Sequence, residues 1–171
     1  MANFLVAAFQ TDLCERLNDL IILCGKSPAE SIELFDDWLS VSTKLNEDGC
    51  IVCAYSGVWS VLFGDYELLA LIFSDTALLK SLALRFETTA VSAYGDDTSC
   101  AYGFNLCSAH NTRSIFVQDS ILENSGEPLA GEPSLDLETY NEEDILQILD
   151  SLGIDIEAGV ESGTKFSTIK V

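Results

Sequence analysis

Hydrophobic residues occur along the chain in short blocks, and their spacing alternates between that of strands and that of helices. The run Phe4–Phe9 (FLVAAF) is continuously apolar and predicts a buried strand. Between Thr11 and Gly25, leucine and isoleucine recur at helical spacing, and Gly25 stands where a helix would end. The start of the chain therefore predicts a strand followed by a helix.

A second helix is predicted directly after this one. Ser27, Pro28 and Glu30 form the pattern of a capping box, in which side chains satisfy backbone N–H groups of the first helical turn. The apolar face of this helix would carry Ile32, Phe35, Trp38 and Leu39.

The middle of the chain is rich in residues that favour strands. Cys50–Tyr55 and Val58–Phe63 flank Ser56-Gly57, a connection of hairpin length. Asp65 can then cap a helical pattern that continues to Leu84, either as one kinked helix or as two.

Three further strands are expected in succession. They are predicted over Phe86–Tyr94, Ser99–Cys107 and Arg113–Asp119, because turn-forming residues separate these β-rich runs. Consecutive strands with short connections predict a meander.

The last part of the chain changes in character. Residues 120–140 contain two Gly-Glu-Pro triplets, which disfavour both helix interiors and central strands, so we expect an extended surface segment. Asn141–Gly153 is the clearest predicted helix, because Asn141 can cap it and three acids occupy its first turn. Lys165–Val171 has strand propensity, and its lysines are typical of an edge strand.

Together these elements predict an α+β fold. Its antiparallel sheet would consist of a hairpin and a three-stranded meander, packed by amphipathic helices. The whole chain, residues 1–171, fits one domain, because a chain of this length can bury a sizeable core. Hydrophobic residues make up 48% of it, which excludes a disordered protein.

The charge of the chain is strongly acidic and narrows the choice of partner. There are 28 acidic and 8 basic residues, so the formal net charge is −20. A surface of this sign repels nucleic acid and anionic membranes and attracts basic proteins. The charge is also uneven, since Asp119–Glu161 contains 13 acidic residues and no basic one. We therefore expect a basic protein as partner, with no nucleic acid and no membrane involved.

The N-terminal residues indicate the compartment. No basic residue precedes Arg16, and the first apolar run is shorter than the core of a signal peptide. We therefore expect a cytoplasmic protein. Its six cysteines are expected to be reduced and to serve as small apolar core residues.

Residues that could carry chemistry are few. His110 is the one histidine, and a dyad with Cys107 is conceivable, but a histidine in a turn is usually only solvated. Cys50 and Cys53 have the spacing of a metal or redox motif, yet positions three apart on a strand point to opposite faces. Phosphate-binding glycine-rich loops and nucleophile-elbow motifs are absent. The sequence thus predicts no enzyme, no cofactor and no metal.

Four segments within residues 50–153 follow one another in a recognisable order. They are Trp59-Ser60-Val61-Leu62, Ala101-Tyr102-Gly103-Phe104 running through a turn to Arg113, Gly126-Glu127-Pro128-Leu129 ending near Glu132, and the acid-capped helix after Asn141. In this order the chain resembles bacterial immunity proteins encoded beside polymorphic toxins, including Rhs-type and contact-dependent systems. The resemblance implies an inhibitor that binds one cognate toxin domain in the cytoplasm and covers its active or binding cleft. It carries over no catalytic residues.

We therefore predict that acidic residues in and near the base-free stretch contact the partner. The predicted contact residues are Asp96, Asp97, Glu127, Glu132, Glu142, Glu143 and Asp144. Two other functions stay open: an inhibitor whose carboxylates imitate nucleic-acid phosphates, and a small hydrolase that uses a pair of acids. If the acids serve only solubility, the interface is to be sought near Trp38 or Trp59.

Overall fold

The computed structural model describes residues 4–28, 30–135, 140–156 and 164–171. Its strands are β1 Phe4–Phe9, β2 Glu33–Phe35, β3 Cys50–Tyr55, β4 Ser60–Gly64, β5 Ala90–Asp96, β6 Ala101–Cys107, β7 Thr112–Gln118, β8 Ser120–Ser125 and β9 Lys165–Lys170. Its helices are α1 Leu17–Leu23, α2 Trp38–Ser42, α3 Tyr66–Ser74, α4 Thr76–Arg85 and α5 Glu142–Ser151, and Lys44–Asn46 form a 3-10 turn. Within the described ranges, no helix combines the length and the apolar character needed to cross a membrane.

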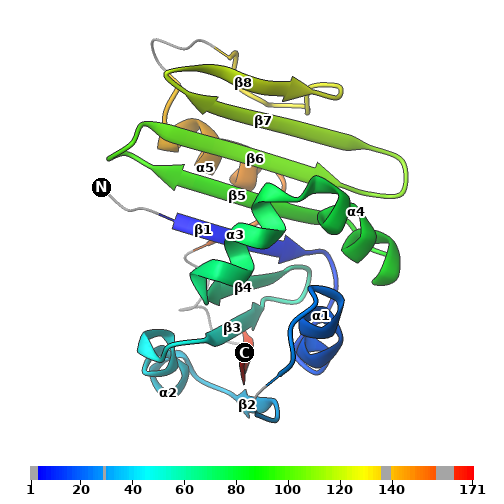
Figure 1. The fold of residues 1–171 in the computed structure, drawn as a ribbon, viewed down its shortest axis with the longest axis vertical. Helices are drawn as coiled ribbons and strands as arrows, with labels where there is room; N and C mark the ends of the chain where they lie inside the picture. Colours follow the sequence, from blue (N-terminus) through cyan, green and yellow to red (C-terminus); the bar gives the residue numbers. More distant parts are fainter. Residues whose placement is uncertain (1–3, 29, 136–139, 157–163) are drawn as a thin grey trace.

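All described strands belong to one antiparallel sheet (Figure 1). Their order is β2-β9-β3-β4-β1-β5-β6-β7-β8. The predicted α+β class with an antiparallel sheet is therefore confirmed. The sheet is larger than a hairpin plus a meander, because β1 lies between β4 and β5 and further strands extend both ends.

Strand β1 lies in the middle of this sheet. Ala7 is paired with Leu62 of β4 on one side and with Ser92 of β5 on the other. Val6 and Ala8 are buried on one face of the sheet, and Ala7 and Phe9 are buried on the other. A strand covered on both faces needs apolar side chains at successive positions, which explains the continuous apolar run.

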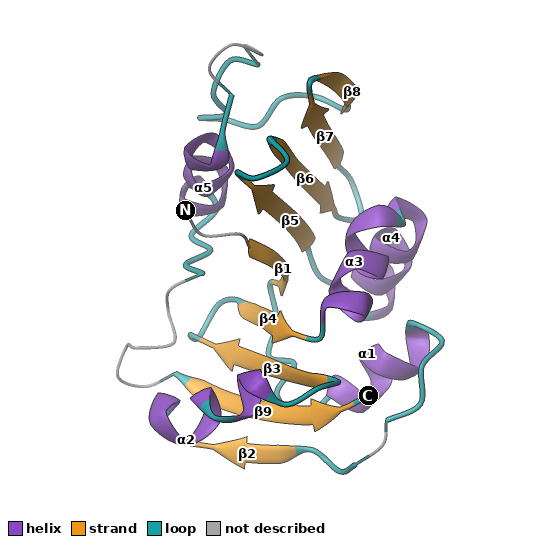
Figure 2. Ribbon diagram, turned by 60° about the vertical axis from the view of Figure 1, so that its left-hand side comes forward, coloured by secondary structure: helices purple, strands orange, loops and turns teal. Residues whose placement is uncertain are grey.

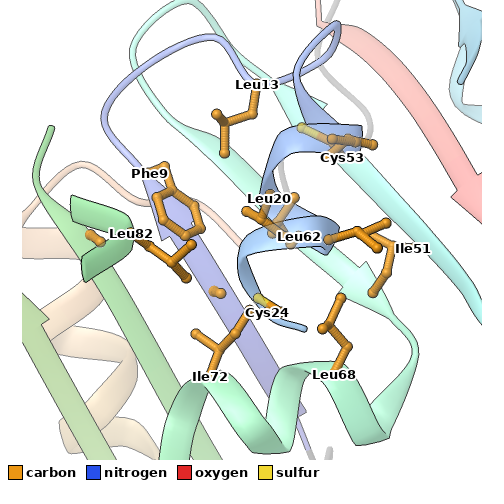
Figure 3. Packing of buried hydrophobic residues seen from close by; sticks show 14 of the residues in the cluster. Phe9, Leu13, Leu20, Cys24, Ile51, Cys53, Leu62, Leu68, Ile72 and Leu82 are labelled. Carbon is orange, nitrogen blue, oxygen red and sulfur yellow. The ribbon is translucent and has the colours of Figure 1, made fainter. Parts of the chain in front are cut away.

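Helices cover the two faces of the sheet (Figure 2). On one face, which we call the α3 face, α1, α3 and α4 enclose the main core; Figure 3 shows Leu20, Ile72 and Leu82 from these helices around Phe9 and Leu62. The opposite side, which we call the α5 face, is covered by α5 over β5 and β6 and by α2 over β9. Burial on both faces thus holds the large sheet together.

The prediction of a helix directly after Ser27 is wrong. Residues Glu33–Phe35 form β2 and pair with β9, and α2 begins only at Trp38, with the carboxylate of Asp37 accepting a hydrogen bond from the amide of Ser40 at 2.8 Å. The local capping pattern at Ser27 does not decide the structure here, because Glu33–Phe35 pair with β9 instead and tertiary pairing can override a local helix signal.

In the C-terminal half, the prediction for the last strand needs correction. Lys165–Lys170 is a strand, but not an edge strand, because β9 lies between β2 and β3. Its Lys165 extends instead towards Asp12, with the ammonium 3.3 Å from the carboxylate. In the segment 120–140, predicted as extended surface, the first six residues form the exposed edge strand β8; residues 136–139 lie outside the described ranges.

The remaining elements follow the predicted pattern closely. The first helix begins later than expected, at Leu17, because the carboxylate of Asp12 accepts the amide of Cys14 at 3.0 Å in a turn. The pattern from Asp65 to Leu84 forms two helices, α3 and α4, each capped by an aspartate. Five cysteines are buried and Cys100 is exposed.

Removal of the α5 cap tests this part of the fold. The side chain of Asn141 accepts a hydrogen bond from the amide of Glu143 at 2.7 Å, and Asp144 completes the capping box. We expect Asn141→Ala to lower the free energy of unfolding by about 0.5 to 2 kcal/mol. Chemical denaturation measures this change. Asn111→Ala, in the exposed β6–β7 turn, is the matched control, and equal effects of the two substitutions would contradict the cap.

Candidate partner-binding surface

The turn between β5 and β6 is ordered by an aspartate. The carboxylate of Asp96 accepts hydrogen bonds from the hydroxyl of Ser99 at 2.7 Å and from the amide of Thr98 at 2.8 Å. These bonds, that from Ser99 first, lower the pKa of Asp96 from its usual 3.8. Asp96 therefore stays ionised while it shapes the turn, and the turn places the next residue, Asp97, at the end of the sheet.

Asp97 brings the turn close to helix α5. Its carboxylate accepts a hydrogen bond from the hydroxyl of Tyr102 at 3.0 Å. Burial, together with this bond and the charge of Asp97, raises the pKa of Tyr102 to about 12. Glu142, the first residue of α5, also lies beside Asp97, and its pKa is raised above 4.5 by burial and then by the charge of Asp97. The fold thus holds two carboxylates together although they repel each other.

A groove opens next to these acids, and we call it the acidic groove. It has a volume of about 570 Å³ and lies between α5, the segment that follows α5, and the start of β1. Apolar side chains and carboxylates line it together. Its apolar residues are Phe4, Leu146, Leu149, Ile154 and Ile156, and its acids are Glu142, Glu143, Asp150 and Asp155.

A smaller hollow of about 280 Å³ lies on the other side of Phe4. Tyr66, Tyr94 and Asp96 line it, and Tyr66 is 63% exposed. Tyrosine is enriched at protein interfaces, because it combines a large apolar ring with a hydrogen-bonding hydroxyl. Both hollows therefore combine apolar contact area with negative charge.

The structure brings together four of the seven predicted contact residues. Asp96, Asp97, Glu142 and Glu143 lie at the end of the sheet, around the two hollows. Asp144 follows on the same helix, but its carboxylate accepts the amide of Asn141 at 2.8 Å in the capping box.

Glu127 and Glu132 lie away from this cluster, in the loop after β8, and only Glu127 is exposed. The side chain of Glu132 is 5% exposed and forms a bidentate ion pair with Arg113, whose side chain is 2% exposed. The Nε of Arg113 lies 3.0 Å from a carboxylate oxygen of Glu132, which also accepts the amide of Leu129 at 2.9 Å. Glu132 is therefore an internal structural residue and is not available to a partner.

The same arginine orders strand β8. One guanidinium nitrogen of Arg113 donates to the side-chain oxygen of Asn124 at 2.7 Å and to the carbonyl of Ser125 at 2.9 Å. Burial alone would raise the pKa of Glu132, but the bonds from Arg113 and Leu129 outweigh it and lower that pKa below 4.5. Sequence reasoning missed this pair, although one signal was present: Arg113 has the same parity along the strand as Ile115 and Val117, which are buried on one face.

The residues considered for catalysis do not form a site. The thiol of Cys107 is buried beneath α4, where it donates to the carbonyl of Thr76 at 3.9 Å, and burial raises its pKa. His110 is exposed, and no hydrogen bond or ion pair of its imidazole occurs among the described residues. Cys50 and Cys53 belong to clusters on opposite faces. The described part of the chain contains no group of three or more potential metal-ligating side chains.

No protein-family profile, curated protein or solved structure matches this chain. The two hollows, the charge around them and the ordered ion pair of Arg113 and Glu132 are the features that indicate what the chain binds.

Breaking the buried ion pair should cost far more than removing an exposed acid. Glu132→Ala leaves Arg113 buried without its counter-charge, so we expect a loss of about 3 to 5 kcal/mol in the free energy of unfolding. Glu127→Ala, in the same loop, should change it by less than about 0.5 kcal/mol. Because the pKa of Glu132 is lowered in the folded state, the pair's contribution is complete above pH 4.5 and is lost as the pH falls through the lowered pKa. Denaturation at several pH values measures both effects, and equal losses for the two variants would contradict the assignment.

Neutralising Glu142 should relieve the cost of burying its charge and its repulsion from Asp97, rather than remove a favourable contact. Its raised pKa means that ionisation disfavours the folded state, so the penalty grows as the pH rises through 4.5 and persists at neutral pH. Glu142→Gln should therefore be more stable at pH 7 than Glu143→Gln, which loses the same helix-dipole interaction without the same neighbour. Thermal unfolding at pH 7 and pH 3.5 is the measurement. A Glu142→Gln protein that is less stable than the Glu143→Gln control at pH 7 would refute the idea that the charge of Glu142 destabilises the fold.

Proposed function

We propose that this chain is an inhibitor of the immunity type, which binds a basic protein toxin domain in the cytoplasm and covers its active or binding cleft. The contact surface would be the end of the sheet around the acidic groove. The chain would act by binding alone, without a cofactor or metal.

The main support is that the fold assembles acids at this place against their own repulsion. Asp97 and Glu142 come from parts of the chain more than forty residues apart, and the pKa of Glu142 is raised first by burial and then by the charge of Asp97. For folding alone, placing such like charges far apart would be more favourable. A basic partner would offset this cost, because positive charges placed next to the acids reduce their mutual repulsion, and they also accelerate association.

The apolar residues in the groove favour a protein ligand. A cleft that binds the phosphates of nucleic acid offers charged and polar groups. An inhibitor that imitates nucleic acid therefore gains little from the partly exposed Phe4 and Leu146 of the groove or from the exposed Tyr66 of the neighbouring hollow. Protein interfaces instead combine an apolar centre with a polar rim. The lining of the acidic groove contains both kinds of residue.

The test begins with the partner that copurifies with the tagged chain from its native host. Asp97, Glu142 and Glu143 are changed together to their amides, and the rates of association and dissociation are measured at several salt concentrations. Exposed acids should act mainly on the association rate, and any acid buried against a basic side chain should cost about 2 to 5 kcal/mol of binding free energy. Co-expression should protect cells from the partner, and the triple variant should protect them less.

The control changes three exposed acids near α1, Glu15, Asp19 and Glu30, to their amides. Both triple variants alter the net charge equally, so a difference between them reports the position of the acids. The proposal fails if both variants change the rates and the salt dependence to the same extent. It also fails if the copurified partner is a nucleic-acid enzyme that the chain inhibits only in competition with DNA or RNA.

A further inference from the structure

Strand β8 ends the sheet with an unpaired edge. It is bonded to β7 on one side, and among the described residues nothing pairs with its other side. All six residues of β8 are exposed, including Ile121 at 41% and Leu122 at 58%. An unpaired edge presents a row of main-chain N–H and C=O groups that can bind another strand.

The usual protection of edge strands is weak here. Edges are normally kept short or carry lysine or proline, and β2, at the opposite end of the sheet, has only three residues. In contrast, β8 has six residues with neither lysine nor proline. A register shift between Phe116 and Val117 interrupts the β7–β8 ladder, but Glu123, Asn124 and Ser125 pair with β7 in regular register beyond it.

The end of β8 is held rigidly in place. Arg113 binds the side chain of Asn124 and the carbonyl of Ser125, and is itself fixed by Glu132. Gly126 then turns the chain with a φ of 82°, so close to β7 that a Cβ atom there would clash with the carbonyl oxygen of Thr112. An edge ordered in advance loses little entropy when a strand is added.

The surface beside this edge is also open. On the α3 face, Phe73 of α3 reaches only as far as Phe116 of β7, with ring centroids 6.0 Å apart, and no described helix lies over β8 (Figure 1). A hollow of about 300 Å³ lies there between α4 and strands β6 to β8, and Glu123 and Ser125 form its β8 side. Lys80 lies on the α4 wall, so the acidic side of the hollow is the side that faces the free edge.

We propose that β8 accepts one extended strand of the partner, paired along its free edge, and that this strand carries lysine or arginine. The basic character rests on the proposed function and on charge complementarity. Asp119, Glu123 and Glu127 lie along and beside the edge, and no basic residue occurs between Asp119 and Glu161. A second copy of β8 would bring these acids towards one another, which disfavours self-pairing. A basic side chain on the added strand can instead reach the carboxylate of Glu123.

A synthetic strand tests this proposal without the native partner. The probe is a fluorescent octapeptide in which lysine alternates with valine, and its control has the same charge but has proline at two of the valine positions. The first peptide should bind about tenfold more tightly or better, because proline prevents main-chain pairing. Hydrogen–deuterium exchange of the bound protein should show new protection in β8.

Two protein variants then locate the binding site. Leu122→Lys places on the edge a lysine, a residue that disfavours strand pairing at edges. It should weaken binding of the lysine–valine peptide by about tenfold or more. Leu84→Lys, on α4, replaces an equally exposed leucine, at 55%, with the same charge change and should leave binding within about twofold. Unfolding curves of both variants verify that they are folded.

The proposal is overturned if the two peptides bind equally, if β8 gains no protection, or if the two variants behave alike. It is also overturned if the protein alone sediments as a dimer that Leu122→Lys dissociates, because a second copy would then occupy the edge. If Leu122→Lys leaves binding of the native partner unchanged while the amide variants of the acidic groove weaken it, only the strand proposal fails. If instead Leu122→Lys weakens binding of the native partner and the amide variants of the acidic groove do not, strand addition stands and the role of the groove is refuted.

Discussion

The pairing of β1 with β4 and β5 is the interaction on which the rest of the structure depends. It joins β2, β9, β3 and β4 to β5 through β8, so that two sets of strands become one sheet. Both faces of β1 are buried, and each contributes to a different core. Because antiparallel register determines which side chains reach which face, this one strand aligns the helices on both sides of the sheet.

The acidic composition is accommodated by the way this sheet is covered. Most carboxylates of the described residues lie in turns, at helix starts or on exposed faces, where water screens them. Among the described basic residues, Arg113 is unusual, because its side chain is buried and its charge is paired with Glu132. Its hydrogen bonds to Asn124 and Ser125 connect β7 with β8 and the following loop. One cation inside the acidic half thus orders the segment that would otherwise be most strongly repelled.

The two proposed binding features belong to the same half of the sheet. The β5–β6 turn and α5 position the acidic groove, and β7 with Arg113 positions the free edge of β8. A partner that contacts both would gain steering from the acids and directional main-chain bonds from the edge. The apolar part of the groove and the strand edge would then supply most of the contact, and the charge would supply speed and selectivity.

The sequence alone was sufficient wherever local chemistry decides the structure. The apolar run of β1, the capped helix α5, the aspartate cap of α3, and the turn between β5 and β6 were all predictable, because each depends on neighbouring residues. The wrong predictions concern long-range pairing: β2 displaced the helix expected after Ser27, and β9 lies inside the sheet because β2 pairs with it. In the same way, the sequence marked Asp97, Glu142 and Glu132 only as acids. Tertiary structure decided that two of them meet at a groove and that the third is buried against Arg113, because side chains distant along the chain become neighbours only when the strands pair.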